Sequence, residues 1–297
     1  MDSTLPLHPL HSLLPLDQPF TPAMARAAGI ERRRLERMLG EGHVRRLLRG
    51  VYAASTAPDT LELRAAAVGL LLGRRDIAVD RTAGWVHGVP LGDPVHLDAL
   101  APGRSHRTAL GGRRHLIARD VVSIAGLRVT TPLRTALDLG RLLAPGQALG
   151  AVDSLLRDGT FTHTALLAEL SRLTGHRGIA QLRLLAAQVD GRSSGLAEST
   201  LRFHWHAANL PTPVPGMPVA AGHRLVRLSL GVERRQFGAV LAHQVSADDL
   251  VGLEGTGWRA VVLPEQRVLH SDPTTWITHL EREFHQHLLT QTEAEAG

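Results

Sequence analysis

Residues 21–53 constrain the fold more than any other stretch, because proline and glycine stand where helices begin and end. Thr21 is suited to cap a helix whose first residue is Pro22, a position at which proline is favoured. Gly29 can adopt the left-handed conformation that ends many helices. We therefore expect a first helix from residue 22 to residue 28, followed by a tight turn.

A second helix is expected over residues 31–39, followed by a short hairpin. Its apolar side chains recur at helical spacing on one face: Leu35, Met38 and Leu39. Strands over residues 43–48 and 50–54 would meet at a turn made by Arg49 and Gly50. Two helices joined by a tight turn and followed by a hairpin form a winged helix-turn-helix, which we predict for residues 17–54.

The same stretch carries the whole charge imbalance of the chain. Residues 21–53 hold eight arginines and three glutamates, a balance of +5, and the formal net charge of the full chain is also +5. Arginine pairs with phosphate and with guanine, and a winged helix places its second helix in the major groove. We therefore expect double-stranded DNA to contact Arg32, Arg33, Arg34, Arg37, Arg45, Arg46 and Arg49. The alternative is a basic surface that is merely solvated.

Two absences from the composition exclude several classes of chemistry. All 33 residues counted as lysine or arginine are arginines, and there is no cysteine. Walker lysines, Schiff-base lysines, catalytic thiols, disulfides and thiolate zinc sites are thereby excluded. The closest histidine pairs, at 204/206 and 285/287, are spaced so that a helix would point their side chains apart. We therefore expect neither a metal site nor a cofactor.

The localisation is expected to be cytoplasmic. The first 16 residues are apolar but contain three prolines and no basic segment, so they do not fit a secretory signal. No apolar run approaches the length of a membrane span, so we expect no membrane contact.

The rest of the chain predicts an α/β (α+β) fold in two further domains, residues 55–190 and 191–297. For the middle domain we expect strands at 95–100, 114–118, 121–124 and 127–131, with helices at 60–73, 132–143, 146–157, 162–173 and 178–189. The sequence GRSSG at 191–195 has the composition of a linker. Beyond it we expect a helix at 196–208, a strand at 214–220, a hairpin of 223–230 with 236–242, a helix at 246–256, a strand at 258–263 and a helix at 273–290.

The C-terminal domain resembles the very-short-patch-repair-type endonuclease domain of the restriction-endonuclease-like superfamily. The resemblance rests on the order of elements, on GLAESTLR at 195–202, which contains Glu198 and Arg202, and on GWRAVV at 257–262. That family places an aspartate on one hairpin strand and Glu-x-Asp-Gly eleven residues later, so that carboxylates hold a divalent cation. At those positions this chain has Ser229, then Val240, Ala242 and His243.

This departure predicts a nuclease-like fold without nuclease chemistry. Glu198 remains as an isolated acid, and an alternative alignment that uses Glu233 places that residue in a solvated hairpin turn. We therefore expect a remnant site at Glu198, Ser229, Val240 and Ala242, and we do not expect an enzyme.

The N-terminal two-thirds of the chain resembles proteins with an AbiEi-type antitoxin N-terminal domain. Three strings carry the resemblance: GVY at 50–52, DRTAGW at 80–85 and TPLRTALDL at 131–139. The resemblance implies a winged helix that represses its own promoter and a nucleotidyltransferase-type toxin as partner.

Three functions remain open at this point. The first is a DNA-binding regulator of the type IV antitoxin kind, whose middle and C-terminal domains mediate homodimer formation or partner binding. The second is a metal-dependent DNA endonuclease of the very-short-patch-repair-like type. The third is a protein-interaction module whose basic helix contacts an acidic protein instead of DNA.

Overall fold

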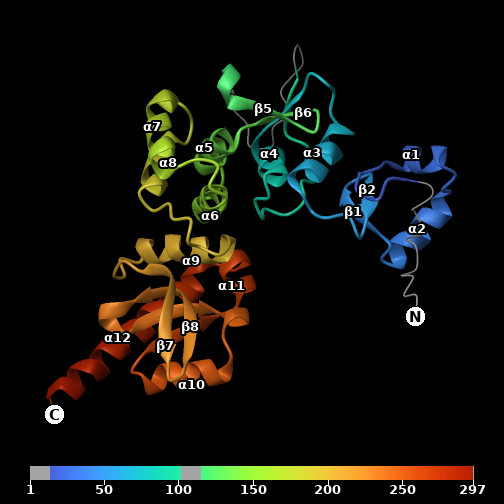
Figure 1. Ribbon diagram of the computed structural model, residues 1–297. Helices are drawn as coiled ribbons and strands as arrows, with labels where there is room; N and C mark the ends of the chain where they lie inside the picture. Colours follow the sequence, from blue (N-terminus) through green and yellow to red (C-terminus); the bar gives the residue numbers. More distant parts are fainter. Residues whose placement is uncertain (1–13, 102–114, 297) are drawn as a thin grey trace. The chain divides into compact units, whose positions relative to one another are not determined.

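The computed structural model describes residues 14–101 and 115–296, and it combines helices with three small sheets (Figure 1). The chain divides into two compact units, Met1–Asp138 and Leu139–Gly297. A mixture of helices and sheets agrees with the α/β class expected from the sequence. The division falls inside α5 (Pro132–Leu142) and differs from the boundaries that we expect after residues 54 and 190.

The first unit begins with two helices and a hairpin in the expected order. They are α1 (Pro22–Ala27), α2 (Arg32–Gly40), β1 (Val44–Leu48) and β2 (Val51–Ala54). The expected cap is confirmed, because the Thr21 hydroxyl accepts a hydrogen bond from the Met24 amide at 3.3 Å, and Gly29 is left-handed with φ +80°. These elements enclose a small core of Phe20, Ala25, Ile30, Leu35, Met38, Val44 and Ala54.

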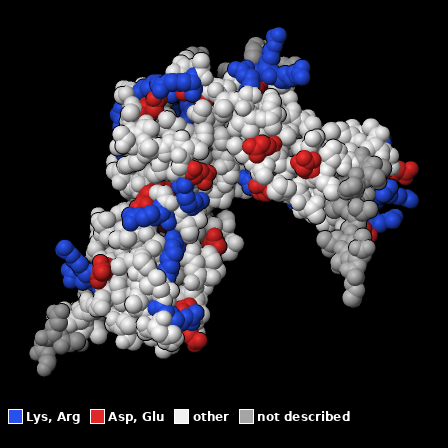
Figure 2. All heavy atoms as spheres, in the orientation of Figure 1, with Lys and Arg blue, Asp and Glu red and all other residues white. Residues whose placement is uncertain are grey.

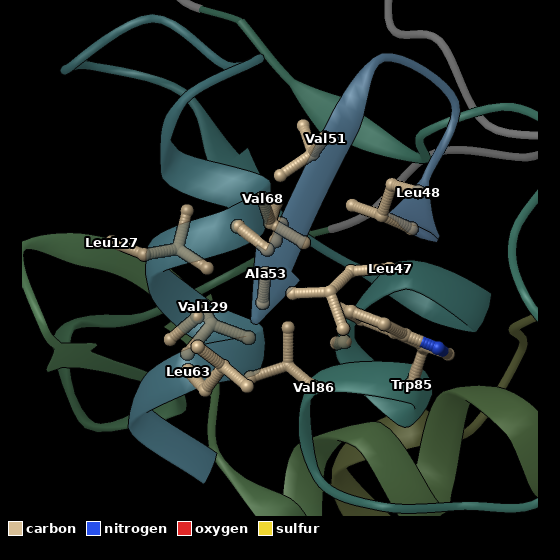
Figure 3. Close-up of a cluster of buried hydrophobic side chains, with 14 of the residues drawn as sticks. Leu47, Leu48, Val51, Ala53, Leu63, Val68, Trp85, Val86, Leu127 and Val129 are labelled. Atoms are coloured by element: carbon tan, nitrogen blue, oxygen red, sulfur yellow. The ribbon is translucent and has the colours of Figure 1, made fainter. Parts of the chain in front are cut away.

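The β1–β2 hairpin contributes to a second apolar cluster as well. Four of its side chains are buried there: Leu47, Leu48, Val51 and Ala53. In Figure 3 they meet side chains from α3 (Leu61–Gly69), α4 (Asp80–Val86) and β6 (Leu127–Thr130). The hairpin is therefore not a free wing, because it joins α1 and α2 to the sheet that follows.

That sheet has the strand order β4-β3-β6-β5, formed by Ala99–Leu100, Ile77–Ala78, Leu127–Thr130 and Val121–Ile124. Strand β3 is parallel to β6, and the other pairs are antiparallel. Of the strand expected at 95–100, only the last two residues pair.

The strand expected at 114–118 is wrong for its described residues. Residue 114 lies outside the described part, residues 115–117 have no strand partner, and a 3₁₀ turn covers Ala118–Asp120. The Asp120 carboxylate accepts a hydrogen bond from the Ile117 amide at 3.1 Å, and this local bond favours a turn over a strand.

The TPLRTALDL string forms the start of α5, and its arginine is buried among carboxylates. Arg134 is 1% exposed. Its guanidinium donates to Asp138 at 2.8 Å, to Asp120 at 2.9 Å and to the His115 carbonyl at 2.8 Å. A buried guanidinium is stable only when charged or polar partners satisfy its donors, so this string encodes a structural network.

We predict that Arg134→Met destabilises the protein by about 3–5 kcal/mol, because two buried carboxylates would lose their shared cation. Urea unfolding followed by circular dichroism measures the loss. The exposed Arg74 provides the control, and Arg74→Met should change the free energy of unfolding by less than about 0.5 kcal/mol. Equal midpoints for the two variants would contradict a structural role for this network.

The second unit begins with helices, and a sheet with further helices follows them. Its first helices after α5 are α6 (Pro145–Arg157), α7 (His163–Glu169), a 3₁₀ turn at Leu170–Leu173, and α8 (Ile179–Ala186). Helix α9 (Leu196–Ala207) packs closely on α6, because α6 has glycine at its contact points. A methyl group on Gly150 would lie 3.2 Å from the Leu196 Cα atom, closer than side chains normally approach.

The segment expected to be a linker, residues 191–195, is part of this packed interface. Ser193 is fully buried, and its hydroxyl accepts a hydrogen bond from Arg202 at 2.8 Å. Its carbonyl accepts another from Arg157. A composition rich in glycine and serine therefore did not distinguish this packed segment from a flexible linker.

A buried ion pair lies between α6 and α9. Asp153 and Arg202 are 1% and 2% exposed, and their side chains are in contact. Asp153 also accepts hydrogen bonds from the Ser199 hydroxyl at 2.6 Å and from the Asp190 amide at 2.8 Å. Burial raises the pKa of Asp153 to about 6, and the partial compensation comes from Arg202 and these hydrogen bonds.

This shift predicts a pH dependence of stability with a defined sign. A carboxyl whose pKa rises from 3.8 to about 6 on folding contributes stability that is complete below pH 3.8 and lost as the pH rises through 6. Between pH 4 and pH 7 the wild type should therefore lose roughly 2–3 kcal/mol more stability than Asp153→Asn. Urea unfolding of both proteins across this range tests it, and parallel pH profiles would contradict it.

The last sheet has the strand order β10-β9-β8-β7, in which only β9 and β10 are parallel. Its strands are Val214–Ala221 (β7), Arg224–Val232 (β8), Phe237–Leu241 (β9) and Arg259–Leu263 (β10). Helices α10 (Ala247–Gly255), α11 (Glu265–His270) and α12 (Pro273–Ala296) complete the unit. In the described residues, neither α12 nor any shorter helix has the length and apolarity needed to cross a membrane.

Two apolar clusters cover this sheet. One joins it to α9 and α12 around Trp205, Phe237 and Trp276, and the other joins it to α10 around Leu228, Val240 and Leu253. The sheet is therefore covered by helices, and α9 is placed beside β8.

Candidate functional site

Helix α2 presents two arginines directly away from its core. It buries Leu35 and Met38. Because each residue turns an α-helix by about 100°, Arg33 and Arg37 lie on the opposite side, one turn apart. Both side chains are exposed. Figure 2 shows basic side chains projecting from the surface over this part of the chain.

Arg32 and Arg34 lie on opposite flanks of the same helix, and Arg32 has a partner. Its guanidinium donates to Glu36 at 2.8 Å, although the two side chains are 86% and 59% exposed. The hydrogen bond and the charge of Glu36 raise the pKa of Arg32, with a smaller contribution from Tyr52 on β2. Arg34 is exposed on the other flank.

The three hairpin arginines differ in how accessible they are. Arg45 is half-buried and donates to the Ala57 carbonyl at 3.0 Å, so its guanidinium is held by the protein backbone. Arg46 is exposed and pairs across the hairpin with Tyr52. Arg49 is exposed at the tip, next to the left-handed Gly50.

Five of the seven expected DNA-contacting arginines thus have no side-chain partner among the described residues. Within residues 14–101 and 115–296, no ion pair or side-chain hydrogen bond involves Arg33, Arg34, Arg37, Arg46 or Arg49. An exposed guanidinium without a partner keeps all five of its N–H donors available to a ligand.

A second polar site lies between α9 and β8, around Glu198. Glu198 is fully buried and accepts hydrogen bonds from the Arg227 guanidinium at 2.6 Å and from the Ser194 amide at 2.7 Å. The Gln244 side-chain amide donates a third, at 3.1 Å. Burial alone would raise the pKa of Glu198, but the hydrogen bonds from Arg227 and Ser194 outweigh it and hold the pKa below its ordinary value.

The structure brings one further expected remnant residue to this site. The Ser229 hydroxyl donates to the Gln244 oxygen at 2.7 Å and accepts from the Leu241 amide at 3.1 Å. Val240 lies elsewhere, in the apolar cluster under α10, and Ala242 is exposed in the 3₁₀ turn after β9. Of the four expected remnant residues, therefore, only Glu198 and Ser229 belong to one network.

Arg227 and Gln244 were not identified from the sequence. Arg227 precedes Ser229 by two residues on β8, and this spacing places both side chains on the same face of a strand. That signal could have identified Arg227. Gln244 lies in an irregular turn, where no periodicity indicates the direction of its side chain.

The chemistry of this network is that of an internal ion pair. It contains a single carboxylate, whose oxygens are occupied by a guanidinium and by N–H donors. In the described part of the chain, no group of three or more His, Asp or Glu side chains is arranged to hold a metal ion. Glu233 lies exposed in the turn between β8 and β9, so it does not supply a second carboxylate.

We predict an asymmetric response to removing either partner of this pair. Arg227→Met leaves a fully buried carboxylate without its cation and should cost about 3–5 kcal/mol. Glu198→Gln leaves Arg227, whose side chain is 41% exposed, able to reach water, so its cost should be smaller, about 1–2 kcal/mol. Urea unfolding of both variants tests the difference. A cost for Glu198→Gln that equals or exceeds that of Arg227→Met would contradict it.

Comparison with known proteins places two segments of this chain in the same antitoxin group. Residues 16–55 match the family model described as transcriptional regulator, AbiEi antitoxin, and residues 71–187 match that of the AbiEi antitoxin C-terminal domain. The first match covers α1, α2 and the hairpin, and the second includes the Arg134 network.

Two curated relatives come from Mycobacterium tuberculosis: uncharacterized protein MT2308 of strain CDC 1551 / Oshkosh and uncharacterized protein Rv2248 of strain ATCC 25618 / H37Rv. Each is 29% identical over 189 residues, which cover 63% of this chain and 69% of the relative. No solved structure matches the chain. The two family matches show that residues 16–55 and 71–187 are similar to segments of AbiEi antitoxins.

Proposed function

We propose that the protein is a transcriptional regulator of the AbiEi antitoxin kind that binds double-stranded DNA through a winged helix at residues 17–54. The observation that carries the proposal is the group of exposed arginines on α2 and the hairpin that have no side-chain partner in the part of the chain that the structure describes. Their segment is the one that resembles AbiEi transcriptional regulators. Arginine that has no partner within the protein is suited to pair with phosphates and base edges.

The docking geometry follows from the order of these elements. A helix that is second in a helix-turn-helix lies in the major groove, and the hairpin beside it contacts the flanking backbone. Arg46 and Arg49 would then contact phosphates, whereas Arg45, which donates to Ala57, contributes little.

The C-terminal domain, in this proposal, has a nuclease-like fold without catalysis. The order of α9, three antiparallel strands, α10 and a parallel strand fits the resemblance to very-short-patch-repair-type endonucleases. The Glu198 carboxylate, which could otherwise bind a metal ion, accepts hydrogen bonds from the Arg227 guanidinium. We propose partner binding, either to a nucleotidyltransferase-type toxin or to a second copy, as the role of this domain and of the middle domain.

A binding experiment with the full-length protein and its own upstream DNA tests the DNA-binding proposal. We expect a gel shift that weakens steeply as salt rises, because each neutralised phosphate releases counterions. The triple variant Arg33→Ala, Arg34→Ala, Arg37→Ala should lose the shift at moderate salt. A matched triple variant of exposed arginines elsewhere, Arg177→Ala, Arg234→Ala, Arg235→Ala, should retain it.

The possible outcomes separate the three functions. No shift at any salt concentration, with a protein partner recovered instead, would overturn DNA binding in favour of an interaction module. Plasmid cutting that requires magnesium and is lost in Glu198→Ala would overturn the non-catalytic interpretation of the C-terminal domain.

A further inference from the structure

The seven arginines of α2 and the hairpin lie close together in the sequence, but their side chains point in different directions in the structure. This inference rests on the proposed DNA binding and concerns which arginines of α2 contact bases and which contact phosphates. We infer that Arg33 and Arg37 are the base-reading pair, and that each recognises a guanine in the major groove. Arg34, Arg46 and Arg49 contact phosphates, and Arg32 is held by Glu36.

The first argument is the direction of the side chains. Leu35 and Met38 fix the buried side of α2, so the side that can lie deepest in a groove is the one opposite them. At about 100° per residue, Arg33 lies almost opposite them, whereas Arg37 and Glu36 each lie about 50° to one side of that direction. A residue on a flank of a recognition helix points towards the walls of the groove, where the phosphates are.

The second argument is whether each of the four arginines of α2 already has a partner within the protein. Arg32 is tied across one turn to Glu36, whose carboxylate would otherwise repel the phosphates. An exposed pair of this type adds little stability, but it biases Arg32 away from the base edges. Arg33, Arg34 and Arg37 have no such partner among the described residues.

The third argument is the match between spacing and ligand chemistry. Arginine donates two parallel hydrogen bonds to the O6 and N7 atoms of guanine, the commonest specific contact in the major groove. Four helical residues rise by about 6 Å, close to two base-pair steps of about 3.4 Å. Where α2 follows the groove, Arg33 and Arg37 would therefore contact guanines about two base pairs apart.

The test selects preferred sites from a random duplex pool with the full-length protein, and then probes the guanines with 7-deazaguanine. This base pairs normally but lacks the N7 acceptor. We expect two guanines about two base pairs apart in the selected site. Replacing either should weaken binding by the wild type about 5- to 100-fold, the range expected for one base contact.

The variants assign each guanine to one arginine. Arg33→Ala should be insensitive to one replacement and Arg37→Ala to the other, because the contact is already absent. Arg34→Ala and Arg32→Ala are the matched controls, since each removes one positive charge from the same exposed helix. Both should keep the full effect of 7-deazaguanine, and Arg34→Ala should bind all sequences less tightly, with a salt slope lowered by about 1.

Failure of this inference differs from failure of the proposed function. If Arg33→Ala and Arg37→Ala keep the guanine preference and only bind all DNA more weakly, the base-reading assignment is wrong although DNA binding stands. If the pool yields no bound sequence and no gel shift occurs, DNA binding itself is wrong. Circular dichroism of each variant confirms that these exposed substitutions leave the fold intact.

Discussion

Burial of one hairpin in two apolar clusters determines how the first unit is built. One group of hairpin side chains, which includes Val44 and Ala54, closes the small core under α1 and α2. Another, which includes Leu47 and Val51, enters the core of α3, α4 and the following sheet. Strand residues point alternately to opposite faces, so a two-stranded ribbon can fill two cores at once. The direction in which α2 presents its arginines is therefore tied to the packing of the sheet.

Arginines in this chain have two distinct environments. Arg134 and Arg202 are buried, and Arg134 pairs with Asp120 and Asp138 whereas Arg202 pairs with Asp153. Those on the outer side of α2 are exposed and have no partner in the described residues. The first kind contributes to a single packed arrangement, and the second remains available for a ligand. Because no lysine is present, both environments use the same side chain, and composition cannot separate them.

The sequence predicted the elements well where short-range rules decide them. Thr21, Pro22 and Gly29 mark α1, and apolar periodicity marks α2, because caps and periodicity act within a few residues. It failed at the linker that is packed through Ser193, where distant contacts decide the outcome, and at the strand expected over 114–118, where the bond between Asp120 and the Ile117 amide favours a turn. The candidate sites show the same limit. The exposure of Arg33 and Arg37 follows from helical spacing, whereas the diversion of Arg45 to Ala57 and the meeting of Arg227 with Glu198 depend on tertiary structure.

The close packing of α6 on α9 determines where this chain can be truncated. The antitoxin match ends at residue 187, yet Asp153, within that match, depends on Arg202 beyond it. Truncation between residues 187 and 202 would leave the buried Asp153 without Arg202 and would expose the face of α6 that carries glycines. The segment that follows the match is therefore part of the same packed unit as α6.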